Sequence, residues 1–305
     1  MTTGPDAKAL RERCAREMAG HPRDYLGVRR DAAGFGWLRE AFLAVRREDF
    51  VPDRVWWPHL EDGACPLIDR ALAPRAWLKS VYLLRTPLIT QLDDGATAAT
   101  GPAVGAFTSS ISSITVTVEA LRVLAPQPGE RVLEIGTGTG YSAALLARRT
   151  GPGTVTSIEI SADLAEAARR RLDRAGAGVR VIAGDGEAGH SEGGPYQRII
   201  ATASVRRIPP AWIAQLAPGG TLVVPLASPF GCDLTVRLTA VGDGRVTGRP
   251  VATVEYMRLR GQRVPEAGQS YGWPADTDPE QWARYTITAD ARGQTVALDD
   301  DRPTP

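Results

Sequence analysis

Short apolar runs alternate with helical segments through the middle of the chain. Val132 to Ile135, Thr154 to Ile160 and Val179 to Asp185 each have the β-branched, apolar character of a buried strand. Each run is followed by a segment with apolar residues at helical spacing, and the alternation continues to Pro225. Strands that alternate with helices predict a parallel sheet with right-handed crossover connections.

The pattern changes after Pro225. The segment Gly242-Asp-Gly244 lies between two strand-like runs and is a hairpin signal. Residues 261–280 are rich in Gly, Pro and charge and are interpreted as a linker or excursion. We expect two pairs of strands in this region, at residues 233–241 with 251–259 and at residues 285–287 with 295–298.

The first hundred residues differ from both of these regions. Helical spacing predicts helices over residues 7–18 and 36–46, and residues 56–85 supply aromatic bulk for a packed cover. Residues 93–104 are rich in Gly, Ala and Thr and are the best candidate for a mobile loop. The expected organisation is an N-terminal cover and substrate region (1–107), a core (108–230) and a C-terminal β extension with a tail (231–305).

The turn after the first strand carries the main chemical signal. Glycines at 136, 138 and 140 allow the backbone to turn sharply and to lie close to a ligand. Dinucleotide-binding folds use the spacing G-x-G-x-x-G, whereas this turn has G-x-G-x-G. Glu134 precedes the first glycine and would repel a pyrophosphate. A cationic ligand with an amino group suits this carboxylate, and S-adenosylmethionine (SAM) has these features.

Two further acids end the next two predicted strands. Glu159 is placed to accept hydrogen bonds from both ribose hydroxyls, and Asp185 is placed to accept one from the adenine amino group. An acid at one strand end is more often a helix cap or a surface group, but three in succession favour a SAM site. The predicted cofactor-binding residues are Glu134, Gly136, Thr137, Gly138, Gly140, Tyr141, Glu159, Ile160, Gly184, Asp185, Gly186 and Thr202. The expected fold is α/β, a doubly wound seven-stranded Rossmann-like sheet of the class I SAM-dependent methyltransferases, with an N-terminal helical cover and a C-terminal β extension.

An ordered set of motifs resembles the protein-L-isoaspartate O-methyltransferase family. Val45-Arg-Arg-Glu-Asp-Phe-Val-Pro52 looks like the family's V-x-R-E-x-F-V-P segment, and residues 132–141 match its first motif. The match continues in order at Gly184-Asp-Gly186, residues 199–203, Ile208-Pro209, Gln215-Leu216 and residues 219–225. The resemblance implies a carboxyl methyltransferase that uses SAM and acts on an aspartyl or isoaspartyl residue of a peptide or protein.

The acceptor side is assigned to the segment 108–114. The family's T-I-S-Q-P segment aligns with Ser110-Ile-Ser-Ser-Ile114, so Ser112 matches the serine that touches the substrate carboxylate and Ser110 replaces the threonine. The Gln-Pro pair is absent here. Serines before an apolar helix are also typical N-caps, and one hydroxyl can cap while its neighbour binds a carboxylate.

The carboxylate acceptor explains why no general base stands out. A carboxylate with a reference pKa near 4 is ionised at neutral pH, so catalysis consists mainly of alignment. A methyl ester on an aspartyl or isoaspartyl side chain can then close to a succinimide (aspartimide) as the neighbouring backbone nitrogen expels methanol.

Three functions remain open on the sequence. The favoured one is tailoring of a ribosomally made precursor peptide, because segments such as residues 66–70 look like an actinobacterial branch of the family and some 80 residues follow Pro225. General repair of isoaspartyl proteins is the alternative, and a non-catalytic peptide-binding scaffold is a further one.

Composition restricts the cellular context. The formal net charge is +1, which gives no bulk attraction to nucleic acid. Three widely spaced cysteines predict reduced thiols and a cytoplasmic location, without a disulfide frame or a metal site. No apolar run is long enough for a transmembrane helix, so no membrane partner is expected.

Overall fold

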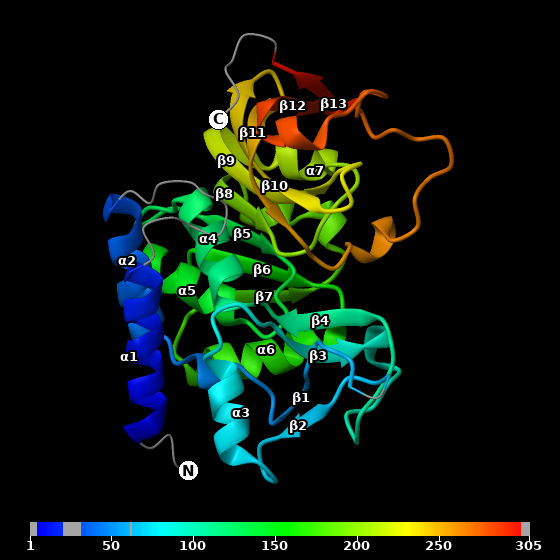
Figure 1. The fold of residues 1–305 in the computed structure, drawn as a ribbon. Helices are drawn as coiled ribbons and strands as arrows, with labels where there is room; N and C mark the ends of the chain where they lie inside the picture. Colours follow the sequence, from blue (N-terminus) through cyan, green and yellow to red (C-terminus); the bar gives the residue numbers. More distant parts are fainter. Residues whose placement is uncertain (1–4, 21–31, 62, 300–305) are drawn as a thin grey trace.

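The computed structural model describes residues 5–20, 32–61 and 63–299, which form two β-sheets and their covering helices (Figure 1). The larger sheet has the strand order β13-β12-β11-β10-β9-β8-β5-β6-β7, and the smaller has the order β2-β1-β3-β4. Together they bear out an α/β fold with a mixed main sheet.

Five strands of the larger sheet run parallel and form the predicted core. They are β5 (Val132–Ile135), β6 (Val155–Glu159), β7 (Arg180–Ala183), β8 (Tyr196–Ala201) and β9 (Leu216–Ala227). The helices that connect or flank them are α4 (Ile114–Leu124), α5 (Tyr141–Thr150), α6 (Ala162–Arg174) and α7 (Pro210–Ala214). The parallel sheet predicted between residues 132 and 225 is therefore confirmed, and the strand–helix alternation is interrupted only between β7 and β8, where the described chain forms 3-10 turns.

The buried side chains divide between the two faces of this sheet. Val132 and Val155 pack with Leu146 and Leu172, from α5 and α6, on one face. Leu133, the neighbour of Val132, packs on the other face among residues that include Trp212 of α7. Since successive strand residues point to opposite faces, this division accounts for runs that are apolar throughout.

The antiparallel half of the sheet differs from the prediction in two ways. Strands β10 (Asp233–Gly242) and β11 (Arg245–Val254) form a hairpin whose turn contains Asp243 and Gly244, both with positive φ. The second strand was expected at 251–259, but it begins directly after this tight turn and ends at Val254. Residues 255–259 therefore leave the sheet.

The late hairpin is confirmed but is not a separate unit. Strands β12 (Tyr285–Asp290) and β13 (Gly293–Leu298) pair with each other, and β12 pairs with β11 through Val246 to Gly248. The sheet therefore has nine strands within the described residues, and the expected number of seven is wrong. The predicted tail lies outside the described residues from position 300 onward.

The N-terminal region contains a sheet as well as helices. Helices α1 (Pro5–Gly20) and α2 (Ala32–Ala44) confirm the two predicted helices, and α3 (Pro74–Val81) follows. The expected helical cover is incomplete, because β1 (Arg54–Trp56), β2 (Leu67–Asp69), β3 (Leu88–Leu92) and β4 (Phe107–Ile111) form the smaller antiparallel sheet. The division at 107/108 falls within β4, and the three-part organisation stays a prediction.

Short 3-10 turns complete the described elements. They are η1 (Arg47–Asp49), η2 (Asp93–Gly95), η3 (Gly186–Ala188), η4 (Ser191–Gly193), η5 (Arg260–Gln262) and η6 (Pro279–Arg284). Three of them, η2, η3 and η5, carry residues that line the cavity described below.

Candidate active site

A cavity of about 900 Å³ joins the ends of the parallel strands to the smaller sheet and to the segment after β11. This volume is within the range of small-molecule and cofactor sites. The predicted site residues on its walls are Ser110, Ser112, Gly136, Thr137, Gly138, Tyr141, Glu159, Ile160, Asp185, Gly186 and Thr202. Glu134, Gly140 and Gly184 are not on its walls.

The glycine turn has the backbone conformation that its sequence predicts. Gly136, Gly138 and Gly140 have φ values of 94°, 53° and 91°, which side chains with a Cβ rarely adopt. The three glycines nevertheless have different surroundings. Gly138 faces the cavity, whereas a Cβ on Gly140 would lie 3.2 Å from atoms of Leu172. Gly140 therefore serves the packing of α5 against α6.

Glu159 ends β6 and is fixed in place by backbone amides. Its Oε2 accepts from the amide of Gly138 at 2.8 Å, and its Oε1 accepts from the amide of Ser161 at 3.1 Å. The side chain is buried but still contributes to the cavity wall. These contacts tie the end of β6 to the glycine turn and hold the carboxylate in one orientation.

Glu134 has different surroundings from those that the sequence suggests. It is fully buried, and its carboxylate accepts hydrogen bonds from the hydroxyls of Ser142 and Ser157. Burial raises its pKa to about 7, the two hydroxyls oppose the rise, and the nearby Glu159 adds to it. The direct contact with the cofactor that was expected of Glu134 stays a prediction.

The third strand end supplies a mixed polar and apolar wall. Asp185 is exposed, and its Oδ1 accepts from the amide of Glu187 at 2.9 Å, so the residue also caps η3. Ile160 exposes 41% of its surface at the cavity, which is unusual for a large apolar side chain. The hydroxyl of Thr202 donates to the carbonyl of Gly136 at 2.5 Å and so supports the glycine turn from behind.

The acceptor segment separates into a capping serine and two cavity serines. Ser113 is the N-cap of α4, and its hydroxyl accepts from the amide of Val116 at 3.4 Å. Ser110 and Ser112 line the cavity, and within the described residues neither hydroxyl makes a hydrogen bond. The capping role that the sequence allows therefore belongs to Ser113. The role of Ser110 and Ser112 toward a carboxylate stays a prediction.

Sequence reasoning missed Arg47 as part of this region. Arg47 is buried, and its Nη2 donates to the carbonyl oxygen of Ser112 at 2.7 Å while its Nε donates to that of Val81 at 2.9 Å. Its guanidinium also lies 4.9 Å from the ring centre of Tyr141. The sequence feature that could have indicated Arg47 is its position within the family-like segment 45–52.

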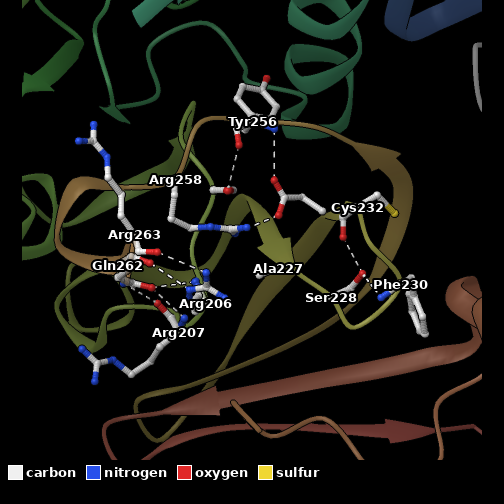
Figure 2. Close-up of polar contacts among 12 residues, drawn as sticks. Arg206, Arg207, Ala227, Ser228, Phe230, Cys232, Tyr256, Arg258, Gln262 and Arg263 are labelled. Atoms are coloured by element: carbon white, nitrogen blue, oxygen red, sulfur yellow. Dashed lines mark hydrogen bonds and ion pairs between the residues drawn. The ribbon is translucent and has the colours of Figure 1, made fainter. Parts of the chain in front are cut away.

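Sequence reasoning also missed the segment Glu255–Arg263, which we call the crossing segment. All of its residues from Glu255 to Arg260, together with Arg263, line the cavity. Figure 2 shows Gln262 of this segment bonded to Arg206 and Arg207, while the amide of Tyr256 and the side chain of Arg258 bond to Asp233 at the start of β10. Part of it was predicted as a strand and part as a linker, and neither pattern indicates a site.

The residues present fit a nucleoside cofactor. A fixed carboxylate (Glu159), an exposed carboxylate (Asp185) and an exposed apolar side chain (Ile160) meet at one end of the cavity. Such a set can take a ribose, an exocyclic amine and an aromatic base. Among the residues that the structure describes, no cluster of His, Cys, Asp or Glu could hold a metal ion, and no helix is long and apolar enough to cross a membrane.

Comparisons with known proteins agree with this geometry. The family model of protein-L-isoaspartate(D-aspartate) O-methyltransferase matches residues 96–264. A protein-L-isoaspartate O-methyltransferase of Methylorubrum populi is 42% identical over 53% of this chain and 74% of its own length. That of Methylorubrum extorquens is 36% identical over 75% of this chain and 81% of its own length.

A solved structure supports the fold. The beta-aspartate methyltransferase structure from Plasmodium falciparum, in complex with S-adenosyl-L-homocysteine, has a TM-score of 0.57 and 16% identity, over 84% of this chain and 99% of its own. The family model spans the glycine turn, the acceptor serines and the whole crossing segment. The chain therefore belongs to the protein-L-isoaspartate O-methyltransferase family, whose members are SAM-dependent carboxyl methyltransferases.

Proposed function

We propose that this protein methylates the free carboxylate of isoaspartyl residues in peptides or proteins. One observation carries the proposal: nine of the twelve predicted cofactor residues and the two cavity serines line the same cavity. Glu159 and Asp185 lie at the carboxyl ends of β6 and β7, and Ser110 and Ser112 lie on and just after β4. A donor and an acceptor bound at these two places would share one cavity.

Bound SAM would supply an activated methyl group. The chain's own residues would then have two tasks, which are to hold the cofactor and to orient the acceptor. Glu159, with the glycine turn, fits the first task, and the hydroxyls of Ser110 and Ser112 fit the second by donating to a carboxylate. Since an ionised carboxylate needs no base, alignment accounts for the rate.

The fate of the ester is the second part of the proposal. Attack by the neighbouring backbone nitrogen on the ester carbonyl forms the five-membered succinimide and releases methanol. Hydrolysis of that ring returns either aspartate or isoaspartate, and repeated cycles would enrich aspartate. Repair therefore follows from methylation and the peptide's own reactivity.

Repair is better supported than tailoring of a dedicated precursor peptide. The relatives are named for protein isoaspartate, and the family model spans the acceptor serines. The family match ends at residue 264, whereas the described structure continues to residue 299. Because residues 265–299 lie outside the family match, tailoring of a precursor peptide by an actinobacterial branch of the family is the second candidate.

A methyl-transfer assay distinguishes the candidates. Wild-type protein, SAM and an isoaspartyl hexapeptide are incubated, and the matching aspartyl hexapeptide serves as the control. Rapid methylation of the isoaspartyl peptide alone supports repair. SAM binding by calorimetry without methylation of either peptide contradicts repair and favours a dedicated substrate, and no SAM binding favours the scaffold.

Variants assign the roles within the site. Glu159→Ala is expected to weaken the binding of S-adenosylhomocysteine, because a fixed acceptor is lost. Ser112→Ala is expected to raise KM for the peptide with little effect on cofactor affinity. Equal effects of the two variants on cofactor and peptide would contradict the assignment of the two ends of the cavity.

A further inference from the structure

Two arginines of the crossing segment converge on one carboxylate at the cavity wall. Arg260 Nη2 donates to Asp94 Oδ1 at 2.9 Å, and Arg263 donates to both oxygens, at 2.5 and 2.9 Å. All three residues line the cavity that also contains Ser110 and Ser112. The hydrogen bond from Arg263 lowers the pKa of Asp94, so its carboxylate is ionised at neutral pH.

The arginine side of this contact is rigid. Gln262, which lies between the two arginines, is buried, and its Oε1 accepts from the amides of Arg206 and Arg207 at 2.8 and 2.9 Å. Its backbone carbonyl accepts from Arg206 Nε at 3.1 Å (Figure 2). These contacts fix the backbone from which Arg260 and Arg263 project.

The same segment is anchored at its other end. Asp233 accepts from the amide of Tyr256 at 3.2 Å and from Arg258 Nη1 at 2.9 Å. The backbone of Ser204 exchanges hydrogen bonds with the segment, at 2.9 Å with Met257 and 2.8 Å with Leu259. The two arginines are therefore presented by a segment held at both ends.

On the other side of the contact, the amide of Asp94 donates to Thr108 Oγ1 at 3.0 Å, whereas within the described residues its carboxylate bonds only to the two arginines. Asp94 lies in the turn η2 between β3 and β4 with φ 54°, a left-handed conformation that costs a non-glycine residue free energy. Its side chain is 36% exposed, and the side chains of Arg260 and Arg263 are 36% and 35% exposed. Solvent screens these partly exposed ion pairs, and another carboxylate can form the same hydrogen bonds to the two guanidinium groups in place of Asp94.

The arginine pair is also under-satisfied. Two guanidinium groups face one aspartate, and Arg260 Nε is buried without a hydrogen-bond partner among the residues that the structure describes. A guanidinium binds a carboxylate best through two parallel hydrogen bonds, which Arg263 makes to Asp94, whereas Arg260 makes a single one through Nη2. The pair thus has donor capacity and positive charge that Asp94 does not use.

We propose that Arg260 and Arg263 form a recognition site for an acidic side chain that flanks the acceptor residue, and that Asp94 occupies this site when no substrate is bound. The proposal rests on the proposed function, because it places a peptide in the same cavity. It adds a preference: peptides with a nearby Asp or Glu are methylated more efficiently than neutral ones.

The test compares isoaspartyl peptides in matched pairs. The two members of a pair differ only in having Glu or Gln at the position two residues before, or two residues after, the acceptor. The wild type is expected to give a kcat/KM about fivefold higher for the Glu peptide, through KM, as an exposed ion pair would give. Arg263→Gln and Arg260→Gln are each expected to remove most of this ratio, and Arg263→Lys to retain part of it. Arg292→Gln, an exposed arginine in the β12–β13 turn, is the matched control and keeps the ratio.

Asp94→Asn distinguishes recognition of an acidic peptide side chain from a purely structural contact, or latch, between Asp94 and the two arginines. If Asp94 competes with the substrate, this variant lowers KM for the Glu peptide and leaves the Gln peptide unchanged. An equal change for both peptides would overturn the proposal and would indicate a latch between η2 and the crossing segment.

A binding arm keeps the proposal independent of catalysis. Calorimetry of the S-adenosylhomocysteine complex measures the affinity for both peptides, whether or not either is methylated. Methylation of both peptides with equal KM and equal affinity overturns the arginine site alone. Absence of methylation overturns the proposed function, and the affinity ratio then decides on the arginine site.

Discussion

Arg47 Nη2 donates a 2.7 Å hydrogen bond to the carbonyl oxygen of Ser112, so a buried arginine near the N-terminus positions the predicted acceptor loop. The same guanidinium lies over the ring of Tyr141, the first residue of α5. Burial lowers the pKa of Arg47, and its two carbonyl partners offset only part of the cost of burying a charge. Arg47 contacts both Ser112 on the acceptor side and Tyr141 on the cofactor side, and a positioning role explains why a buried charge is kept there.

Arg47→Met is expected to lower the free energy of unfolding by about 2 kcal/mol, because the carbonyls of Val81 and Ser112 lose their donor. It is also expected to lower kcat/KM for an isoaspartyl peptide by at least about tenfold, since the acceptor loop loses its alignment. Urea denaturation and steady-state kinetics measure the two effects. Arg39→Met, at an exposed position of α2, is the control, and an equal loss in that variant would contradict the positioning role.

The three neighbouring serines allow a second prediction. Ser113→Ala removes the N-cap of α4 and is expected to cost about 1 kcal/mol of stability. Ser112→Ala removes a cavity hydroxyl that bonds to nothing in the described residues, so stability is expected to stay within about 0.5 kcal/mol while KM for the peptide rises. Thermal denaturation with kinetics distinguishes them. The reverse pattern would show that the two serines had been assigned the wrong way round.

The glycine turn leads to a third prediction. Gly140→Ala forces a side chain into a conformation with φ 91° and places its Cβ 3.2 Å from Leu172. The expected loss is about 2 kcal/mol or more, from strain and overpacking together. Gly129→Ala has φ 82° but no atom within 4 Å, so it reports the backbone strain alone. The difference between the melting temperatures of the two variants measures the contribution of the α5–α6 contact. Equal losses of melting temperature would show that this contact contributes nothing.

The parallel core was predictable from the sequence because the spacing of apolar residues and of glycines is a local signal. Val132 to Ile135 and the glycines that follow specify a strand and a turn without reference to the rest of the chain. The nine-stranded sheet was not predictable in the same way. Its outer strands depend on the pairing of Val246 with Ala289, between segments far apart in sequence, and no local pattern encodes that register.

The site shows the same contrast. Glu159 and Asp185 were found because strand ends meet at one edge of a parallel sheet. Arg263 was assigned to the linker predicted over residues 261–280, because charge and glycine in sequence resemble solvated loops, and Arg260 fell between that linker and the strand predicted to end at 259. Their role depends on Gln262, whose buried amide fixes the segment through contacts with residues more than fifty positions away. Only the folded chain shows that contact.

Glu134 leads to the last prediction, which concerns pH. Its carboxyl is fully buried with a pKa of about 7, against an ordinary pKa of 4.5 for a glutamate in the unfolded chain. The folded state therefore holds a proton that the unfolded state releases between these values. The contribution of Glu134 to stability is fully present below pH 4.5 and is lost as the pH rises through 7.

The size of this loss is set by the pKa difference. A rise of this size corresponds to at most about 3 kcal/mol between pH 4.5 and pH 8. Glu134→Gln keeps a neutral, hydrogen-bonding side chain, so its free energy of unfolding should fall less than that of the wild type over this range. Urea denaturation from pH 5 to pH 8, without SAM, measures the difference. Glu192→Gln, at a side chain that is 79% exposed, is the control, and parallel pH curves for wild type and Glu134→Gln would show that Glu134 is already ionised at pH 5 in the folded protein.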